Sequence, residues 1–206
     1  MHDKLDRRQV RTKQVLLQAL LELIEEKGTE QISVTDISNR ADLNRGTFYL
    51  HYRDVPDMLE QIKEEAFDRI RVLILALDPK ELLDHLNRGM AYPKSVRLFE
   101  EFASHRLFYK VILGPNGDMS FLNRLKGLFQ NHLYAKFTYD VEESGRLVPI
   151  DYLIAYSISA NLGVVQHWIQ NGMQQSPEAI SLILSGLMNY GPLVASGLKL
   201  KVAPQP

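Results

Sequence analysis

Two short helices are encoded by residues 33–52, which are SVTDISNRADLNRGTFYLHY. Ser33 is a good N-cap for the first helix, because its hydroxyl can accept a hydrogen bond from a free backbone N–H. That helix ends by Asp42, a residue type that tolerates the left-handed backbone of a tight turn. Asn44 then caps a second helix, which we expect to run to about Tyr52. Two short helices joined this tightly predict a helix-turn-helix.

The second short helix has one apolar face and one polar face. With Phe48 fixed inward, the rotation of about 100° per residue turns Gly46, Thr47 and Leu50 to the opposite side. This exposed face is the part that could enter a major groove of DNA. Gly46 lets the backbone approach closely, and Arg45 could make a bidentate contact with guanine.

Apolar residues recur at helical spacing almost everywhere in the chain, and no segment alternates with period two. We therefore predict an all-α fold. A helix over 8–27 precedes the helix-turn-helix and ends at Gly28, and a long helix over 55–77 follows it. The remaining predicted helices are 93–105, 107–113, 119–139, 150–170 and 177–196.

The pattern of the first quarter of the chain resembles the DNA-binding domain of the TetR/AcrR family of bacterial transcription regulators. The resemblance rests on Gly28, on Ser33-Val34-x-x-Ile37, Ala41 and Leu43, and on Gly46-Thr47-Phe48-Tyr49-x-His51-Tyr52. It implies DNA contacts at Ser33, Thr35, Asn44, Arg45, Gly46, Thr47, Tyr49, His51, Tyr52 and Arg53. The family often has a phosphate-binding lysine where this chain has Val55, and Arg53 is the candidate to replace it.

The same resemblance divides the chain into two domains and a tail. Residues 8–68 are expected to form the DNA-binding domain, with the motif at about 33–52. Residues 69–200 are expected to form a larger helical domain for effector binding and dimerisation, and 201–206 a disordered tail. The stretch from Asn161 to Pro177 is similar to a type of C-terminal domain found in Gram-positive members of the family.

The C-terminal region is rich in large aromatic side chains. They either form an ordinary aromatic core or line an apolar cavity with a few polar groups, and the sequence leaves both open. The candidate lining residues of such an effector pocket are Phe102, Tyr109, Phe129, His132, Tyr156 and Gln166. The last two long helices carry more apolar surface than one chain easily buries, which together with the family resemblance predicts a homodimer through them. That apolar surface is expected at Leu153, Tyr156, Ala160, Gly163, Val164 and His167 on one helix, and at Ile180, Leu184, Leu187 and Met188 on the other.

Several classes of protein are disfavoured. No nucleophile and base pair, metal-ligand spacing or phosphate loop occurs, so we expect neither an enzyme nor a metal site nor a cofactor. There are no cysteines, and no apolar run approaches the roughly 20 residues of a membrane span. The N-terminus has no apolar signal region, so we expect a cytoplasmic protein.

Charge and composition alone do not mark the chain as a DNA-binding protein. The formal net charge is -1, but Lys4, Arg7, Arg8, Arg11 and Lys13 crowd the start of the chain. These cations indicate either a DNA-contacting face or an ordinary solvated helix. The leading hypothesis is a repressor that a small molecule releases from operator DNA. The alternative is a family member that acts as a co-activator through a protein partner.

Overall fold

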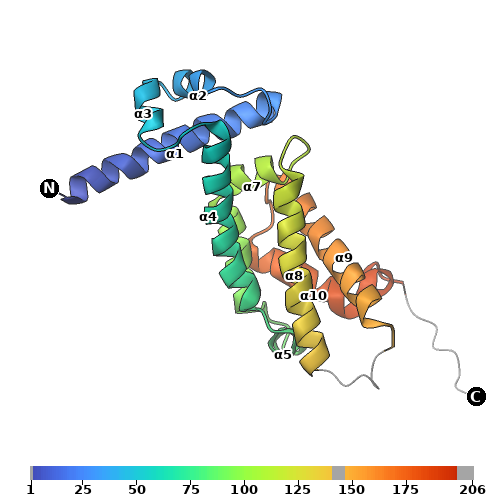
Figure 1. Cartoon of the computed structure of the whole chain (residues 1–206). Coiled ribbons are helices and arrows are strands. Elements are labelled where there is room, and N and C mark those ends of the chain that lie inside the picture. Colours follow the sequence, from blue (N-terminus) through green and yellow to red (C-terminus); the bar gives the residue numbers. More distant parts are fainter. Residues whose placement is uncertain (1, 141–146, 199–206) are drawn as a thin grey trace, which may run out of the picture. The chain divides into compact units, whose positions relative to one another are not determined.

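The computed structural model describes residues 2–140 and 147–198 (Figure 1). All regular elements within these two segments are α-helices, which confirms the predicted all-α fold. They are α1 (His2–Lys27), α2 (Val34–Arg40), α3 (Arg45–Tyr49), α4 (Val55–Leu75), α5 (Pro79–Asn87), α6 (Pro93–Ser104), α7 (Arg106–Ile112), α8 (Met119–Asp140), α9 (Ile150–Gln170) and α10 (Pro177–Ala195). The predicted tail at 201–206 lies outside the described residues.

The helix-turn-helix begins and turns as its sequence predicts. The Ser33 hydroxyl accepts a hydrogen bond from the Asp36 backbone N–H, and the Asp36 carboxylate accepts one from the Ser33 N–H, which completes a capping box. Asp42 adopts a φ of 52° in the turn between α2 and α3, and Gly28 adopts a φ of 75° after α1. Local capping chemistry therefore sets the limits of these helices.

Three helices differ from the prediction. The helix α5 was not predicted, although Asp78 is its N-cap and Pro79 stands in its first turn. The helix α3 ends at Tyr49, and the chain turns there, because the His51 N–H bonds to the carbonyl of Phe48, three residues back. The helix α1 begins at His2 rather than near residue 8. Its side chains at 7–11 are exposed, so no buried stripe marks this early start.

The chain forms two compact units. Unit 1 contains residues up to Arg69 together with 105–124, and unit 2 contains 70–104 and the residues from Leu125 onward. The sequence assigned 105–124 to the C-terminal domain. In the structure this segment joins unit 1, because α7 packs on α1 and Asp118 pairs with Lys63 at 2.7 Å.

The core of unit 1 is built on the apolar stripe of α1, and Figure 1 shows α2 and α3 against this helix. Leu16, Leu20 and Ile24 are fully buried on that stripe. Ile37 of α2 and Phe48 of α3 are each 0% exposed, so both short helices are held by apolar packing. A five-residue helix is unstable alone, and this packing is what keeps its exposed face in place.

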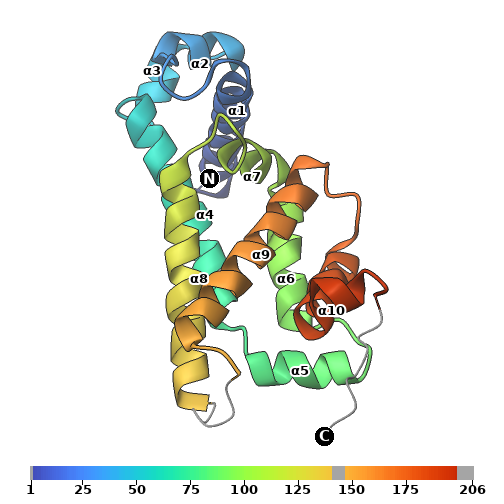
Figure 2. The ribbon, with the colours of Figure 1, turned by 90° about the vertical axis from the view of Figure 1, so that its right-hand side faces the viewer.

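The core of unit 2 forms where α10 packs on α6 and α9 packs on α8 (Figure 2). Leu133 of α8 meets Ile154 and Ile158 of α9 in one buried cluster. Trp168 is 2% exposed and lies edge-to-face on Phe99, with ring centroids 5.7 Å apart. Unit 2 therefore has its own apolar interior, independent of unit 1.

One helix passes a length and composition test for membrane spans. The helix α10 reaches a mean hydropathy of 1.2 over the window tested, although no single apolar run in it is long. Its backbone is non-helical at Gly191, and Pro192 follows directly. Its residues Ile180, Ser181 and Leu184 are buried inside unit 2, whereas most of the helix is not buried.

Candidate functional site

The outer face of α3 carries the side chains that the sequence placed there. Asn44 is the N-cap, and its Oδ1 accepts a hydrogen bond of 2.8 Å from the Gly46 N–H. Tyr49 is 58% exposed and Leu50 is 81% exposed. Phe48, the residue before them, is fully buried. A leucine this exposed, next to polar groups on a short helix, offers an apolar contact for the methyl group of thymine. The sequence did not single out Leu50 as a contact.

Gly46 is not required by the fold of this chain. Its φ lies outside the left-handed region, and a Cβ added there would meet only the Asn44 Oδ1 at 3.5 Å, an ordinary van der Waals distance. Glycine in a helix lowers stability by roughly 0.5–1 kcal/mol relative to alanine. The absence of a side chain on this exposed face therefore suits the close approach of another molecule.

The arginines around the motif differ in what they bind. Arg45 is exposed and makes no ion pair with any residue that the structure describes. Arg40, by contrast, pairs with Glu22 and Glu26 of α1 at 3.3 and 2.7 Å. Arg45 is thus available for an external partner, whereas Arg40 joins α2 to α1.

Arg53 is also exposed, but it is engaged. Its side chain is 85% exposed and its guanidinium pairs with Asp57 at 2.9 Å. The Asp57 carboxylate also accepts the Arg53 backbone N–H, and these two bonds from Arg53 lower the pKa of Asp57 to about 2. A phosphate contact by Arg53 would have to compete with this carboxylate.

Two predicted contact residues are used by the fold instead. The Ser33 hydroxyl and N–H both bond to the Asp36 carboxylate, so Ser33 serves mainly to start α2. Tyr52 is 5% exposed and packs on Phe48, and its burial raises its pKa to about 12. Its ring is therefore part of the core. Thr35, Thr47 and His51 are partly exposed, and Asn44 is exposed.

The basic start of α1 lies in the same unit as the motif. Arg8 and Arg11 are exposed, and the Lys13 ammonium lies 5.8 Å from the centre of the Tyr52 ring, a cation–π distance. Lys13 therefore contacts Tyr52, which lies three residues beyond the end of α3. The side chain of Lys4 lies outside the described residues.

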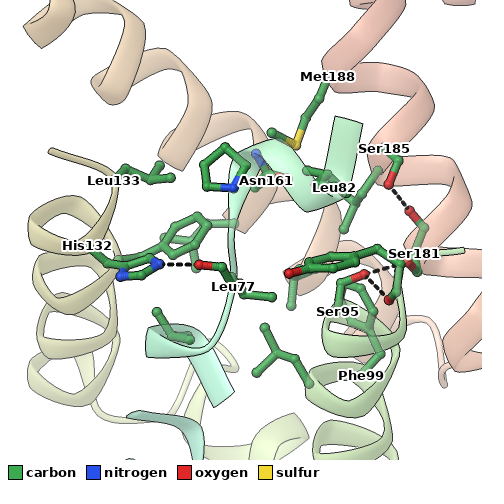
Figure 3. Close-up of a pocket in the computed structure, with 18 of the residues that line it drawn as sticks. Leu77, Leu82, Ser95, Phe99, His132, Leu133, Asn161, Ser181, Ser185 and Met188 are labelled. Carbon is green, nitrogen blue, oxygen red and sulfur yellow. Dashed lines mark hydrogen bonds between the residues drawn. The ribbon is translucent and has the colours of Figure 1, made fainter. Parts of the chain in front are cut away.

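Unit 2 contains an apolar cavity of about 160 Å³ (Figure 3). Its walls come from the last turns of α4, from α5 and α6, and from α8, α9 and α10. The residues that line it include Ile74 of α4, Leu77 two residues after α4, Phe99 of α6 and Leu133 of α8. The aromatic residues of this region therefore do not fill the interior completely.

The polar groups in the wall are hydrogen-bonded to one another. Nε2 of His132 lies 2.8 Å from the carbonyl oxygen of Leu77, and the hydroxyls of Ser95 and Ser181 lie 2.6 Å apart (Figure 3). Asp78 pairs with Lys136 at 2.8 Å, and this bond holds the pKa of the carboxyl near 2. Polar groups thus close the wall without leaving a free charge in it.

The structure brings together half of the predicted pocket residues. Phe102, Phe129 and His132 line the cavity, whereas Tyr109, Tyr156 and Gln166 do not. Tyr156 is 58% exposed, because it stands half a helical turn out of phase with the lining residue Val165. Gln166 is turned about a quarter of a turn from the same wall. Tyr109 is fully buried in α7, where it belongs to unit 1 and packs on Phe108.

The exposed surface of α9 and α10 agrees with the sequence prediction only in part. Ile180 and Leu184, predicted to face a second subunit, are 3% and 7% exposed, because α10 packs on α6. The exposed side chains are instead Tyr152, Tyr156, Leu182, Ile183, Met188, Tyr190 and Leu193. Of the residues predicted for this surface, the exposed ones are Tyr156, Ala160, Gly163, His167 and Met188. Gly163 of α9 is open, and a Cβ there would meet nothing within 4 Å.

Among the described residues, no group of His, Asp and Glu side chains has the arrangement of a metal site.

Two family models match separate parts of the chain. The model for bacterial regulatory proteins of the tetR family matches residues 16–62, which include the helix-turn-helix. The model for the C-terminal region of transcriptional regulators, of the same family, matches residues 91–190. The chain belongs to the TetR family. The resemblance inferred from the motif is therefore confirmed.

Curated relatives of the chain occur in Bacillus subtilis. The uncharacterised HTH-type transcriptional regulator YxbF is 34% identical over 168 residues, which cover 80% of this chain and 41% of YxbF. A second one, YvdT, is 35% identical over 60 residues, or 27% of this chain and 31% of YvdT. The chain therefore spans less than half the length of the relatives it matches.

Solved structures of TetR regulators share the fold. A regulator from Streptococcus agalactiae aligns with a TM-score of 0.56 at 18% identity, covering 91% of this chain and 99% of the other. One from Syntrophomonas wolfei aligns at 0.58 and 19%, covering 94% and 98%. FadR from Bacillus subtilis, in complex with stearoyl-CoA, aligns at 0.53 and 19%, covering 85% and 96%.

Membership of the TetR family defines the broad class of function. Members are DNA-binding transcriptional regulators and are typically dimeric. The matching family models describe transcriptional regulators, as the sequence led us to expect, and not enzymes. The exposed face of α3 and the cavity of unit 2 are the two features of this TetR chain that remain to be assigned.

Proposed function

We propose that this chain is a cytoplasmic repressor that binds operator DNA as a homodimer and is released by a small molecule bound in unit 2. The observation that carries the proposal is the face of α3, where Gly46 is open, Arg45 has no ion pair among the described residues, and Leu50 is 81% exposed. Each of these is unfavourable or neutral for the fold and useful for docking in a major groove.

The residues of this face have different roles in the proposal. Arg45 makes a bidentate contact with guanine, and Leu50 packs on a thymine methyl group. Tyr49, Thr47 and His51 contact phosphate oxygens, and Arg8 and Arg11 add cationic charge near the backbone. Ser33 and Tyr52 support the motif from within, since the fold already uses their polar groups and ring.

A second copy of the chain covers the exposed apolar residues of α9 and α10. Tyr156 at 58% and Tyr190 at 58% exposure are large side chains that a lone subunit leaves in water. The open position at Gly163 allows close approach of a partner helix. A two-fold dimer would present two α3 helices to half-sites spaced about 34 Å apart, or multiples of this.

The cavity favours a diffusible effector over a protein partner. If aromatic rings filled the core completely, a co-activator that acts through a protein partner would be the better hypothesis. A space of about 160 Å³ remains instead. FadR of Bacillus subtilis, a protein of the same fold, holds a small-molecule ligand, stearoyl-CoA. Ile74 and Leu77 line the cavity at the end of α4, the helix whose earlier turns belong to unit 1. A ligand that displaces them alters α4 and with it the spacing of the recognition helices.

The test is a selection of bound DNA from a pool of random duplexes. We expect the wild-type protein to enrich a two-fold symmetric pair of half-sites. Arg45→Ala should lose about 1–3 kcal/mol of binding free energy on the selected site and little on random DNA. Arg97→Ala, which removes the same charge from an exposed position of α6, is the matched control and should bind like wild type. No enrichment, or equal losses in both variants, would exclude α3 as the reading helix.

A further inference from the structure

The hydroxyl groups in the cavity wall donate their hydrogens within the protein. Tyr92 donates to the Glu81 carboxylate at 2.7 Å, and Ser95 donates to the Tyr92 carbonyl oxygen at 2.8 Å. Since Ser95 has one hydrogen, the Ser181 hydroxyl is the donor in the 2.6 Å contact between the two serines. Ser185 donates to the Ser181 carbonyl oxygen. None of these hydroxyls has a hydrogen left for a ligand.

The cavity also lacks a charge to pair with an ion. Asp78 is the one charged residue among the described residues that line it. One of its oxygens binds the Lys136 ammonium, and the other accepts the backbone N–H groups of Lys80 and Glu81. An anionic ligand would therefore be buried with neither a cation nor a set of donors, which strongly opposes binding.

Asn161 of α9 lines the cavity and has both a free hydrogen-bond donor and a free acceptor. One hydrogen of its amide nitrogen bonds to the Ser157 carbonyl at 2.7 Å, which fixes the orientation of the amide. Its Oδ1 and its second N–H have no partner among the described residues. A hydroxyl group, which both donates and accepts, satisfies these two atoms together, whereas an ether or a carbonyl satisfies only the N–H.

His132 adds a second acceptor. A carbonyl oxygen can only accept, so Nε2 of His132 carries the hydrogen in its 2.8 Å contact with Leu77. The neutral ring then keeps a lone pair on Nδ1. His132 thus offers a ligand an acceptor but no donor, because its N–H is already bonded to Leu77.

The size of the cavity limits the ligand to about one ring. A buried apolar space of roughly 150 Å³ accommodates benzene, and this cavity measures about 160 Å³. We propose that the cavity binds an uncharged, ring-sized molecule with a hydroxyl group, such as a phenol or a cyclic alcohol, whose hydroxyl pairs with Asn161. This inference rests on the proposed function, since it names the effector class of the same cavity.

The test compares three probes of similar size on the full chain at about pH 8. 4-Ethylphenol and 4-methylanisole are isomers, one with a hydroxyl and one with an ether, and 4-methylbenzoate is an anion. Binding is followed through Trp168, the single tryptophan, which contacts the lining residue Phe99. We expect 4-ethylphenol to bind about tenfold tighter than 4-methylanisole and at least about a hundredfold tighter than 4-methylbenzoate.

Asn161→Leu assigns the hydroxyl contact. The variant should lose the tenfold preference for 4-ethylphenol but still bind 4-methylanisole, which reports that the cavity is intact. Asn131→Leu, an exposed position of α8 outside the lining, should keep the tenfold preference. A preference that survives in Asn161→Leu, carboxylate binding as tight as that of the phenol, or no binding of any probe would overturn the ligand class.

A parallel measurement on operator DNA separates this inference from the proposed function. Probe binding in the expected order, without any change in DNA affinity, would support the ligand class and contradict effector release. Release of DNA by an anion that outcompetes the phenol would support effector release and contradict the ligand class.

Discussion

Replacement of Gly46 by alanine should change folding stability and DNA affinity in opposite directions. The added Cβ would meet only Asn44 Oδ1, at 3.5 Å, and the backbone of Gly46 does not need a left-handed φ. Alanine is favoured over glycine in helices by roughly 0.5–1 kcal/mol, so the free energy of unfolding should rise by up to that amount. A change that harmed the fold would lower it.

The same methyl group stands on the face that we assign to DNA. If it holds α3 away from the base edges, at least one base contact is lost, which corresponds to about 1–3 kcal/mol of binding free energy. Affinity for the selected operator should then fall roughly 5- to 160-fold. Urea denaturation followed by circular dichroism measures the first effect, and fluorescence anisotropy with labelled operator measures the second.

Gly127→Ala is the matched control for Gly46→Ala. Gly127 lies within α8, and a Cβ there would meet nothing within 4 Å. It should gain similar stability and bind operator like wild type. Unchanged DNA affinity in a folded Gly46→Ala variant would refute the close approach of α3 to DNA.

Three other substitutions test the packing, the dimer and an ion pair. Phe48→Ala should lower the unfolding free energy by about 3–5 kcal/mol in urea denaturation, because the side chain is fully buried; a loss below about 1 kcal/mol would contradict its place in the core. Tyr156→Glu should shift the protein in light scattering from a dimer to the monomer mass of 23.6 kDa, whereas a monomeric wild type would exclude the proposed interface. Asp118 is partly buried, which alone would raise its pKa, but hydrogen bonds from Lys63 and Ser120 bring it down to about 2. Its ionised form should therefore contribute about 2 kcal/mol above pH 4, lost as pH falls through about 2. Acid unfolding of Asp118→Asn should lack this component, and an unchanged acid profile would refute the assignment.

The helix-turn-helix could be predicted because its signals are local. Ser33 with Asp36, Asn44, and the 100° rotation around Phe48 all act within a few residues of chain. The same local reasoning missed that Tyr52 is buried. That outcome depends on which neighbour the side chain meets after folding.

The cavity could be predicted only in part because its walls come from distant segments. Ser95 and Ser181 are 86 residues apart, and no pattern near either one indicates that their hydroxyls meet. The sequence indicated aromatic content, which gave Phe102, Phe129 and His132, but not the phase of each helix. Tyr156 was therefore assigned to the cavity although it lies on the opposite side of α9 from Val165.

The helix α5 was missed for a related reason. The helix has only nine residues, and none of its side chains is buried. The cap at Asp78 and the proline at 79 were visible in the sequence, but over so short a segment they were taken for a connection between helices.

The most direct test of the account is the affinity of the folded wild-type protein for the DNA upstream of its own gene, compared with a random duplex across a salt series. We expect binding at least about a thousandfold tighter to the upstream DNA at physiological salt. We also expect a steep loss of affinity for both duplexes as salt rises, because the cations of α1 and α3 displace counterions from phosphates. Equal affinity for the two duplexes, with no ligand present, would contradict the proposal that α3 represses by reading an operator at its own promoter.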